Sequence, residues 1–386
     1  MAVHIGNTHA QKKRRNGDFY EILARRNAFY IKRFADRTDI YRKISFFDIE
    51  TTGFSAARTS LYLIGCAARK KNLLIVDQFF AETPADESDV LHAFLDYLKN
   101  FDTIITFNGI GFDIPYLTNK CQKYKISAPF SSYEYVDIYK MISGFRFLFA
   151  LPDLKQKTVE QFIGLNRQDM YNGGELIKVY QEYQKNPDEK LISLLKQHNY
   201  EDVIDMPKLL SVLSYVKLFD GAFTVTSINA NEYVSYDGRP CRELLFSLQN
   251  DFSVPKRVSC HYEDFHLVVD TDQTTLCVRL YTGELKYFLS DYKNYWYLPE
   301  EDLAIPSSLA ASIPKERRKK ATAGTCYEKR NAIFLPQYQE IVKPAFRHMF
   351  KDKKSYFELT EDFAVSKEMQ REYCLHVLQF ICNKKM

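Results

Sequence analysis

The succession of short apolar segments that starts at residue 44 restricts the fold of this chain more than any other feature. Residues 44–50, 61–69 and 73–80 are short and rich in β-branched or aromatic side chains, and residues 51–53 and 70–72 punctuate them. Such segments are typical of strands. Strands joined by short connections pair antiparallel, because a parallel pair needs a long crossover. The sequence therefore predicts an antiparallel three-stranded meander.

Helical and strand patterns alternate after the meander. Residues 86–99 carry apolar side chains at positions i, i+1, i+4, i+5 and i+8, which predicts a helix that Ser88 or Asp86 can cap. A fourth strand is predicted at 103–107 and a further helix at 115–124. We therefore expect an α/β domain of the α+β kind, built on a mixed sheet.

The pattern changes twice downstream. Residues 151–219 are helical in pattern, and Pro207 is expected to kink a helix there or to start a new one. Strand patterns separated by turn residues follow from residue 221, at 223–228, 242–248, 265–270, 275–281 and 285–289. From residue 299 the sequence mixes helical patterns with a basic stretch. We expect a smaller β-rich domain with terminal helices.

These patterns divide the chain into a basic helical extension over 1–43, the mixed-sheet domain over 44–220 and the β-rich domain over 221–386. The charge is uneven: the whole chain carries +4, whereas residues 1–43 carry +7, residues 315–354 carry +8 and the rest carries −11. Basic segments beside an acidic body favour binding of a polyanion at an acidic, metal-loaded site. The alternative is that both segments are solvated helix faces and loops.

Composition excludes several classes of protein. Hydrophobic residues make up 46% and charged residues 26%, which is typical of folded domains. No apolar run reaches the roughly 18 residues of a membrane span, and residues 1–15 are polar and basic, unlike a secretory signal. The eight cysteines are scattered without a CxxC motif, so we expect reduced thiols in a cytoplasmic protein.

Two acids interrupt the first apolar strand. Asp48 and Glu50 stand two residues apart in FFDIETTG, so both side chains point to the same face of a strand. Buried carboxylates this close together are costly without a cation, and Mg²⁺ prefers carboxylate oxygens. The pair therefore predicts a metal site. Its alternative is an exposed strand end with two solvated acids.

Further candidates follow the fourth strand and lie in a downstream helix. Asn108 and Asp113 stand in NGIGFD, where an isolated Asp is more often a turn former. In an RNase H-like fold, whose element order this chain follows, the ends of the first and fourth strands are neighbours, which makes Asp113 a third candidate carboxylate. His198 and Asp202 are four residues apart in HNYED and share one helix face. Taken alone, they form a solvated surface pair.

Together these residues are far more specific than any one of them. Asp48, Glu50, Asp113 and Asp202 suit two divalent ions, Mg²⁺ or Mn²⁺, about 4 Å apart. One ion would activate a water for in-line attack, and both would stabilise charge on the attacking and leaving oxygens. His198 would act as general base, because an imidazole titrates near neutral pH.

Three motifs resemble those of a known superfamily. DIETTG (48–53), NGIGFD (108–113) and HNYED (198–202) resemble the exonuclease motifs of the DEDD, or DnaQ-like, 3′–5′ exonucleases, and NGIGFDIPYL is similar to the second exonuclease motif of family-B DNA polymerases. The stretch from VDIYK, at Asp137, to HNYEDVIDMPKLL resembles the YprB-type RNase H-like domain. The resemblance covers residues 44–215 and leaves the rest without a recognised family.

The resemblance implies a role for each matching position. The four acids would bind the metal ions, Asn108 would approach the terminal nucleotide, and the backbone at Thr51 and Thr52 would hold the 3′ end. Asp137 has no defined role in the YprB-like pattern and would only cap a helix.

The histidine departs from the family pattern. In the histidine-bearing members the His precedes the last Asp by five residues, whereas His198 precedes Asp202 by four, which is the spacing of the tyrosine subtype. This departure leaves the metal site intact and the general-base assignment open.

The second domain carries weaker signals. Lys315, Arg317 and Arg318 in PKERRKK would clamp phosphates, with a solvated surface turn as the alternative. The aromatic residues that are dense in this domain are base-stacking platforms or, as we favour, core and sheet residues. His261 and His266 fit no metal-site spacing, which favours a structural role.

The expected function is hydrolysis of phosphodiester bonds, as a 3′–5′ exonuclease on single-stranded RNA or DNA. The direction rests on the resemblance alone. One alternative is a catalytically inactive nucleic-acid-binding module, against which the complete set of acids argues. Another is a structure-specific endonuclease that uses the same site. The expected partner is nucleic acid, and no membrane is involved.

Overall fold

The computed structural model describes residues 43–70, 73–168, 171–234 and 238–385. The helical extension expected over 1–43 therefore lies outside the described residues, apart from Lys43.

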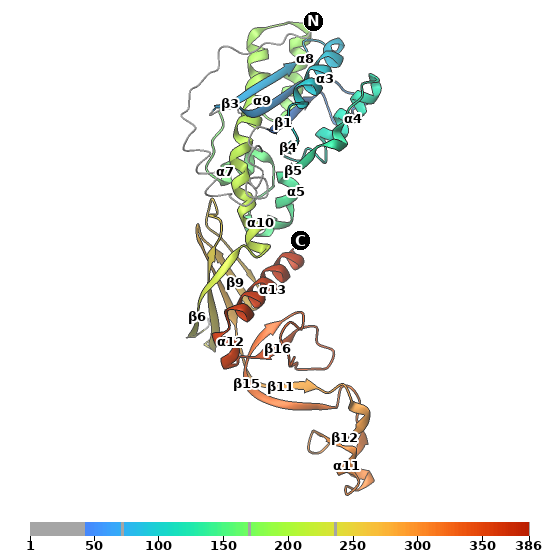
Figure 1. The fold of residues 1–386 in the computed structure, drawn as a ribbon, viewed down its shortest axis with the longest axis vertical. Coiled ribbons are helices and arrows are strands. Elements are labelled where there is room, and N and C mark those ends of the chain that lie inside the picture. Colours follow the sequence, from blue (N-terminus) through green and yellow to red (C-terminus); the bar gives the residue numbers. More distant parts are fainter. Residues whose placement is uncertain (1–42, 71–72, 169–170, 235–237, 386) are drawn as a thin grey trace. The chain divides into compact units, whose positions relative to one another are not determined.

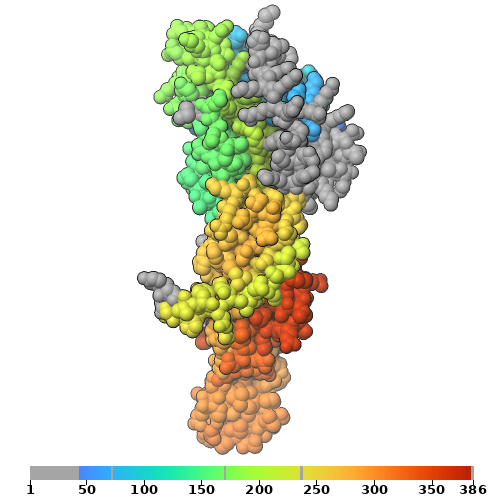
Figure 2. Space-filling model, turned by 90° about the vertical axis from the view of Figure 1, so that its left-hand side faces the viewer, coloured from blue at the N-terminus to red at the C-terminus, as the bar shows by residue number. Residues whose placement is uncertain are grey.

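The chain divides into two compact units (Figure 1). The first runs to Lys217 and includes Phe252–Lys256, and the second comprises Leu218–Asp251 and the chain from Arg257 onward. The residues of the second unit run from yellow-green to red in Figure 2. The three-part division expected from the sequence stays a prediction.

A five-stranded mixed sheet forms the centre of the first unit (Figure 1). Its strands are β1 (Ile44–Thr51), β2 (Leu61–Lys70), β3 (Leu73–Phe80), β4 (Thr103–Thr106) and β5 (Glu134–Asp137). They lie in the order β3-β2-β1-β4-β5, antiparallel from β3 to β1 and parallel from β1 to β5. The predicted meander and fourth strand are confirmed. β5 was not predicted, because its four residues EYVD contain no apolar run.

Helices pack on both faces of this sheet. The helical elements between Pro84 and Phe219 are α3 (Glu87–Leu98), α4 (Asp113–Lys123), α5 (Ile138–Ile142), α6 (Arg146–Phe149), α7 (Gln156–Phe162), α8 (Gly173–Lys185), α9 (Glu189–Leu209) and α10 (Leu213–Phe219), with 3₁₀ turns η2 (Pro84–Asp86), η3 (Phe130–Ser132), η4 (Ser143–Phe145) and η5 (Leu210–Val212). Phe47 and Ile49 of β1 pack in one hydrophobic cluster with Phe94 of α3. Because successive side chains of a strand alternate between faces, Asp48 and Glu50 point to the opposite face, on which α9 lies.

Two details of the predicted helices are corrected. Asp86 stands at the N-cap position of α3 but makes no cap hydrogen bond. Its carboxylate instead accepts hydrogen bonds from the amide (2.9 Å) and the hydroxyl (3.0 Å) of Thr83 in the preceding turn. Pro207 does not start a new helix, because α9 continues through it to Leu209.

The described part of the second unit contains three antiparallel sheets. The largest has the order β6-β7-β10-β9-β8, and the smaller two have the orders β11-β15-β16 and β13-β12-β14. The strands are β6 (Phe223–Val234), β7 (Pro240–Asn250), β8 (Val258–Tyr262), β9 (Phe265–Val269), β10 (Gln273–Arg279), β11 (Tyr281–Phe288), β12 (Tyr295–Leu298), β13 (Leu303–Pro306), β14 (Lys319–Lys320), β15 (Tyr327–Gln337) and β16 (Ser355–Glu358). The helical elements are η6 (Tyr292–Asn294), α11 (Ser307–Ala310), η7 (Lys315–Arg317), α12 (Glu361–Val365) and α13 (Lys367–Lys385).

The β-rich class of this unit is confirmed, and its details differ from the prediction. β6 continues past residue 228 to Val234 as an exposed polar strand that pairs with β7. The tail after residue 299 contains four strands besides its helices. β15 begins with the polar run YEKRN, so its pairing with β11 and β16, not an apolar run, defines it as a strand. Within the described residues, no helix combines the length and apolar character needed to cross a membrane.

A buried ion pair ties α3, α4 and β2 together. Lys120 Nζ lies 2.7 Å from Glu87 Oε1, and both side chains are 1% exposed. Glu87 also accepts hydrogen bonds from the Leu61 amide (2.6 Å) and the Tyr124 hydroxyl (2.6 Å). Burial raises the pKa of Glu87, but the contact with Lys120 and the hydrogen bonds from Tyr124 and Leu61 outweigh burial and hold the pKa below its ordinary value of 4.5. The pair therefore fixes α4, whose first residue is Asp113.

We predict that Lys120→Met lowers the free energy of unfolding of the first unit by about 3 kcal/mol, because it removes the nearest cation of a buried carboxylate and leaves only Lys123, 3.5 Å away. The double variant Glu87→Gln/Lys120→Met should lose less of the free energy of unfolding. Far-UV circular dichroism during urea unfolding measures this free energy. The single tryptophan, Trp296, lies in the second unit and reports on the wrong part of the chain.

The pH dependence of the pair has a defined sign. A carboxyl whose pKa is lowered by folding stabilises the protein above the unfolded-state pKa and loses that contribution as the pH falls through the folded-state value. Wild type should therefore lose more stability than Glu87→Gln between about pH 5 and pH 3. Equal losses in the two proteins would contradict this role of the pair.

Candidate active site

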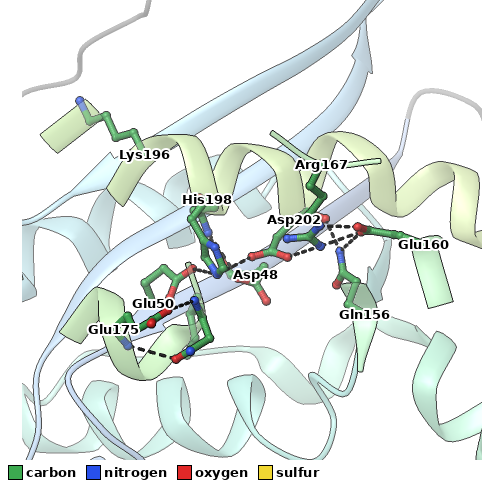
Figure 3. Close-up of polar contacts among 12 residues, drawn as sticks. Asp48, Glu50, Gln156, Glu160, Arg167, Glu175, Lys196, His198 and Asp202 are labelled. Carbon is green, nitrogen blue, oxygen red and sulfur yellow. Dashed lines mark hydrogen bonds and ion pairs between the residues drawn. The ribbon is translucent and has the colours of Figure 1, made fainter. Parts of the chain in front are cut away.

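Acidic side chains from β1 and α9 meet on one face of the sheet (Figure 3). Asp48 and Glu50 alternate with buried Phe47 and Ile49 along β1, and His198 and Asp202 are one turn apart on α9. His198 Nε2 lies 3.3 Å from Asp202 Oδ2 and 3.7 Å from Glu50 Oε1. The structure thus brings together residues that are about 150 positions apart in the sequence.

Asp113 joins this group through an edge of β1. β4 pairs only with residues 44–46 of β1, so the following part of that edge is open to other partners. The Ile49 amide donates to Asp113 Oδ1 over 3.1 Å, and Asp113 is 4% exposed. This contact places the first residue of α4 beside the strand that carries Asp48 and Glu50.

Burial and mutual repulsion disturb the titration of these acids. Burial first, then the charges of Asp202, Asp113 and Glu50, raise the pKa of Asp48 well above its ordinary value. Burial also raises the pKa of Asp113 to about 7. Carboxylates held together out of water destabilise one another's charged forms. A bound cation reverses this penalty, so the electrostatics of the group fit a metal site.

The ligand atoms also fit a divalent cation. One oxygen of Glu50, one of Asp202 and a ring nitrogen of His198 all lie within 4.8 Å of one another. Atoms that share one Mg²⁺ at about 2.1 Å lie at most about 4.2 Å apart, so small side-chain movements bring the three onto one ion. Asp48 and Asp113, which the sequence also predicts as ligands, lie next to this trio rather than in it. The trio includes His198, which the sequence analysis assigns to proton transfer and not to the metal.

Asn108 lines a cavity beside the acids. The cavity has a volume of about 580 Å³, and Asp48 and Asp202 also line it. Asn108 has φ of 67°, in the left-handed region. Asp137, 3% exposed, fixes this turn, because it accepts hydrogen bonds from the amides of Asn108 (2.9 Å) and Ile110 (3.0 Å). It also caps α5, as expected, through the Lys140 amide.

The threonines of the DIETTG motif shape their own loop. Thr51 donates its hydroxyl to the Gly53 carbonyl, at 2.9 Å. The amide of Thr52 donates to the Ser60 carbonyl over 2.8 Å, and its hydroxyl accepts from the Ser60 amide over 2.8 Å. Within the described loop the Thr52 amide is thus already used, although the family resemblance implies that this backbone holds a 3′ end.

The predicted basic clamp belongs to the second unit. Arg317 pairs with Glu300 (3.0 Å) and with Glu301, so its charge is balanced locally. The guanidinium of Arg318 lies 4.7 Å from the centre of the Trp296 ring. Lys315 is exposed.

The two histidines of the second unit face each other across strands. His261 of β8 pairs directly with His266 of β9, and their ring centres are 6.1 Å apart. They do not belong to the metal-binding trio found in the described residues.

Asn199 is a functional candidate that the sequence analysis misses, although it stands inside HNYED. It is fully buried, and its Nδ2 lies 3.4 Å from both the carbonyl oxygen and Oδ2 of Asp48. Its Oδ1 accepts from Gln78 Nε2 over 3.1 Å. Gly65 lies directly opposite Asp48 on β2, and a Cβ there would be 2.0 Å from Asn199 Oδ1. The absence of a side chain at Gly65 thus lets Asn199 reach Asp48.

We predict that Gly65→Ala displaces Asn199 from Asp48. Overpacking of this kind costs about 1–3 kcal/mol, and loss of a partner that orients a metal ligand weakens metal binding by about tenfold or more. Thermal unfolding and Mn²⁺ titration calorimetry measure the two effects. Gly173→Ala is the matched control, because nothing lies within 4 Å of a Cβ at that position. Wild-type values in Gly65→Ala would show that Asn199 does not hold Asp48.

Comparison with known proteins assigns the first unit to a fold class. Residues 45–214 match a family model described as RNase_H superfamily. No curated protein matches the chain.

Two solved structures are similar to this chain. The family B DNA polymerase of the hyperthermophilic archaeon Pyrobaculum calidifontis has 17% identity and a TM-score of 0.36, over 66% of this chain and 35% of the polymerase. The zinc-bound complex of E. coli ExoI with single-stranded DNA has 11% identity and a TM-score of 0.27, over 54% of each chain. The chain thus spans about a third of one structure and about half of the other. With the family match, the predicted class, an RNase H-like mixed-sheet domain before β-rich sheets and terminal helices, is confirmed.

Proposed function

We propose that this protein is a metal-dependent nuclease of the DEDD type, close to the YprB group, and that it removes nucleotides from the 3′ end of single-stranded RNA or DNA. The observation that carries the proposal is the convergence of Asp48, Glu50, Asp113 and Asp202 beside a cavity, with His198 between Glu50 and Asp202. A buried group of four acids disfavours its own charged state without a cation. Near a polyanion, such a group serves hydrolysis better than binding alone.

The four acids would hold two divalent ions, Mg²⁺ or Mn²⁺. When bound, the ions would supply an activated water and stabilise charge on the attacking and leaving oxygens. The residues of the chain would supply the rest. Asn199 would hold Asp48 in place. His198 would take the proton of the attacking water, because Nε2 faces the acids and a histidine can accept a proton near neutral pH.

The nucleic acid would enter through the cavity that Asn108 lines. Asn108 would contact the terminal nucleotide, and the loop at Thr51 and Thr52 would border its 3′ end. The second unit would contribute Lys315, Arg317 and Arg318 as phosphate contacts. We also propose that the protein acts in the cytoplasm.

The first prediction of this proposal is a metal-dependent ladder. The protein should shorten 5′-labelled single-stranded RNA or DNA from the 3′ end when Mn²⁺ or Mg²⁺ is present, and Asp48→Ala/Glu50→Ala should abolish this cleavage. A circular single strand should stay intact. Cleavage of the circle would favour the endonuclease. Salt-sensitive binding with no cleavage of any substrate would favour the inactive binding module.

The second prediction separates proton transfer from metal binding. His198→Ala should lower turnover by about 10²–10⁴-fold, as expected for a lost general base, while the Mn²⁺ affinity measured by calorimetry stays close to wild type. Turnover at the wild-type rate would remove His198 from the mechanism. A parallel fall in Mn²⁺ affinity would make His198 a ligand of the ion, in line with its place in the trio with Glu50 and Asp202.

A further inference from the structure

A buried arginine lies against the candidate metal site. Arg167 follows α7, and its side chain is 3% exposed. Its Nη2 lies 2.6 Å from Asp202 Oδ1 and donates to Glu160 Oε1 over 2.7 Å, while its Nε donates to Glu160 Oε2 (Figure 3). Taking a guanidinium out of water is costly unless it is paired and hydrogen-bonded. A buried arginine also repels a metal ion bound nearby. Its position beside a cation-binding site therefore indicates a specific role.

Glu160 compensates the charge of this arginine. Its side chain is fully buried, and it receives two hydrogen bonds from the guanidinium. Gln156 Nε2 bridges Glu160 Oε1 (3.0 Å) and the main-chain carbonyl of Asp202 (2.7 Å). Because Arg167 and Glu160 cancel each other, the pair adds no net charge to the site. The guanidinium still contacts Asp202 directly, through an ion pair that is also a hydrogen bond, and this directional contact orients the carboxylate.

The two oxygens of Asp202 have different partners. Oδ1 is held by Arg167, and Oδ2 faces His198 Nε2 at 3.3 Å. Glu50 Oε1 lies 3.7 Å from the same nitrogen. The planar fork of Nε and Nη2 is fixed on Glu160, so the Nη2 that also contacts Asp202 Oδ1 has a fixed position and restrains that oxygen. Oδ2 is the oxygen that this arrangement turns toward Glu50 and His198.

The segment that carries Arg167 is anchored to the helix that carries Asp202. The amide of Gln168 donates to Glu201 Oε1 over 3.2 Å, and Gln197 Nε2 donates to the same oxygen over 2.6 Å. Glu201 precedes Asp202 on α9 and is 7% exposed. The segment of Arg167 is thus hydrogen-bonded to α9, the helix that carries Asp202.

We propose that Arg167 is a positioning residue for the metal site, and that with Glu160 it holds Asp202 so that only Oδ2 is presented to the ion. This inference rests on the proposed function, in which Asp202 is a metal ligand. A phosphate contact is a poorer explanation of Arg167, because its Nε and Nη2 are already used and its side chain is nearly inaccessible. The more accessible basic side chains that line the cavity are Arg146 and Lys155.

The experiment measures Mn²⁺ affinity by calorimetry on metal-free protein, independently of cleavage. The double variant Glu160→Gln/Arg167→Gln keeps the net charge of the site and removes the ionic fork. We expect its dissociation constant for Mn²⁺ to rise by about 10–100-fold, the usual effect of losing a partner that orients a metal ligand. Circular dichroism checks that the variant is folded.

A second variant covers the case in which the double variant does not fold. Arg167→Lys keeps the charge beside Glu160 but lacks the planar fork, and we expect about tenfold weaker Mn²⁺ binding. The control is Leu98→Ala, which truncates a fully buried side chain of α3 in the hydrophobic cluster and leaves a cavity there. It should lower stability and leave Mn²⁺ affinity unchanged.

The outcomes separate this inference from the proposed function. If wild type binds Mn²⁺ and both Arg167 variants bind it equally well, the positioning role is overturned and the nuclease proposal stands. A fall in affinity of the same size in the control would also overturn it, because general destabilisation would then explain the loss. If wild type neither binds Mn²⁺ nor cleaves nucleic acid, the proposed function fails and this role fails with it.

Discussion

Repulsion among buried carboxylates is the constraint on which the rest of the first unit depends. Four acids lie on or beside β1, and burial together with neighbouring charges raises the pKa of Asp48 and that of Asp113. A fold that keeps such a group ionised needs cations and rigid partners. The partners are visible in the structure: the Ile49 amide on Asp113, Asn199 on Asp48, and Arg167 on Asp202. Each partner holds one carboxylate in place, so that the repelling acids cannot move apart.

The scaffold transmits this constraint to distant parts of the unit. The Glu87–Lys120 pair fixes α3 and α4, and α4 begins at Asp113. Asp137 at the end of β5 holds the left-handed turn at Asn108. Gly65 leaves the space that Asn199 needs. These residues would touch neither metal nor nucleic acid, yet each positions a residue that is proposed to do so, Gly65 through Asn199. Their buried polar groups are satisfied by specific hydrogen bonds, which is the condition for burying them at all.

The second unit is a different kind of structure. Its strands include polar segments such as the outer part of β6 and the start of β15, which are defined by pairing with neighbouring strands. Arg317 is neutralised by glutamates, and Arg318 and Lys320 flank Trp296, whose ring centre lies 4.7 and 4.4 Å from their charged groups. A run of basic residues in the sequence therefore corresponds to a partly compensated surface. The net charge of this run is therefore larger than the charge that is available to bind a polyanion.

The sequence by itself determined the order of elements from β1 to α4, because short apolar runs and helical periodicity are local signals. It also determined that Asp48 and Glu50 share a face, since alternation along a strand is a local property. Only the tertiary structure decided which side chains complete the site. No local signal marks Glu160, Arg167 or Asn199. Residues of these types are mostly exposed, so the sequence predicts surface positions for them until their partners are known. Only the fold also placed His198 within reach of both Glu50 and Asp202, because that proximity depends on α9 packing against β1.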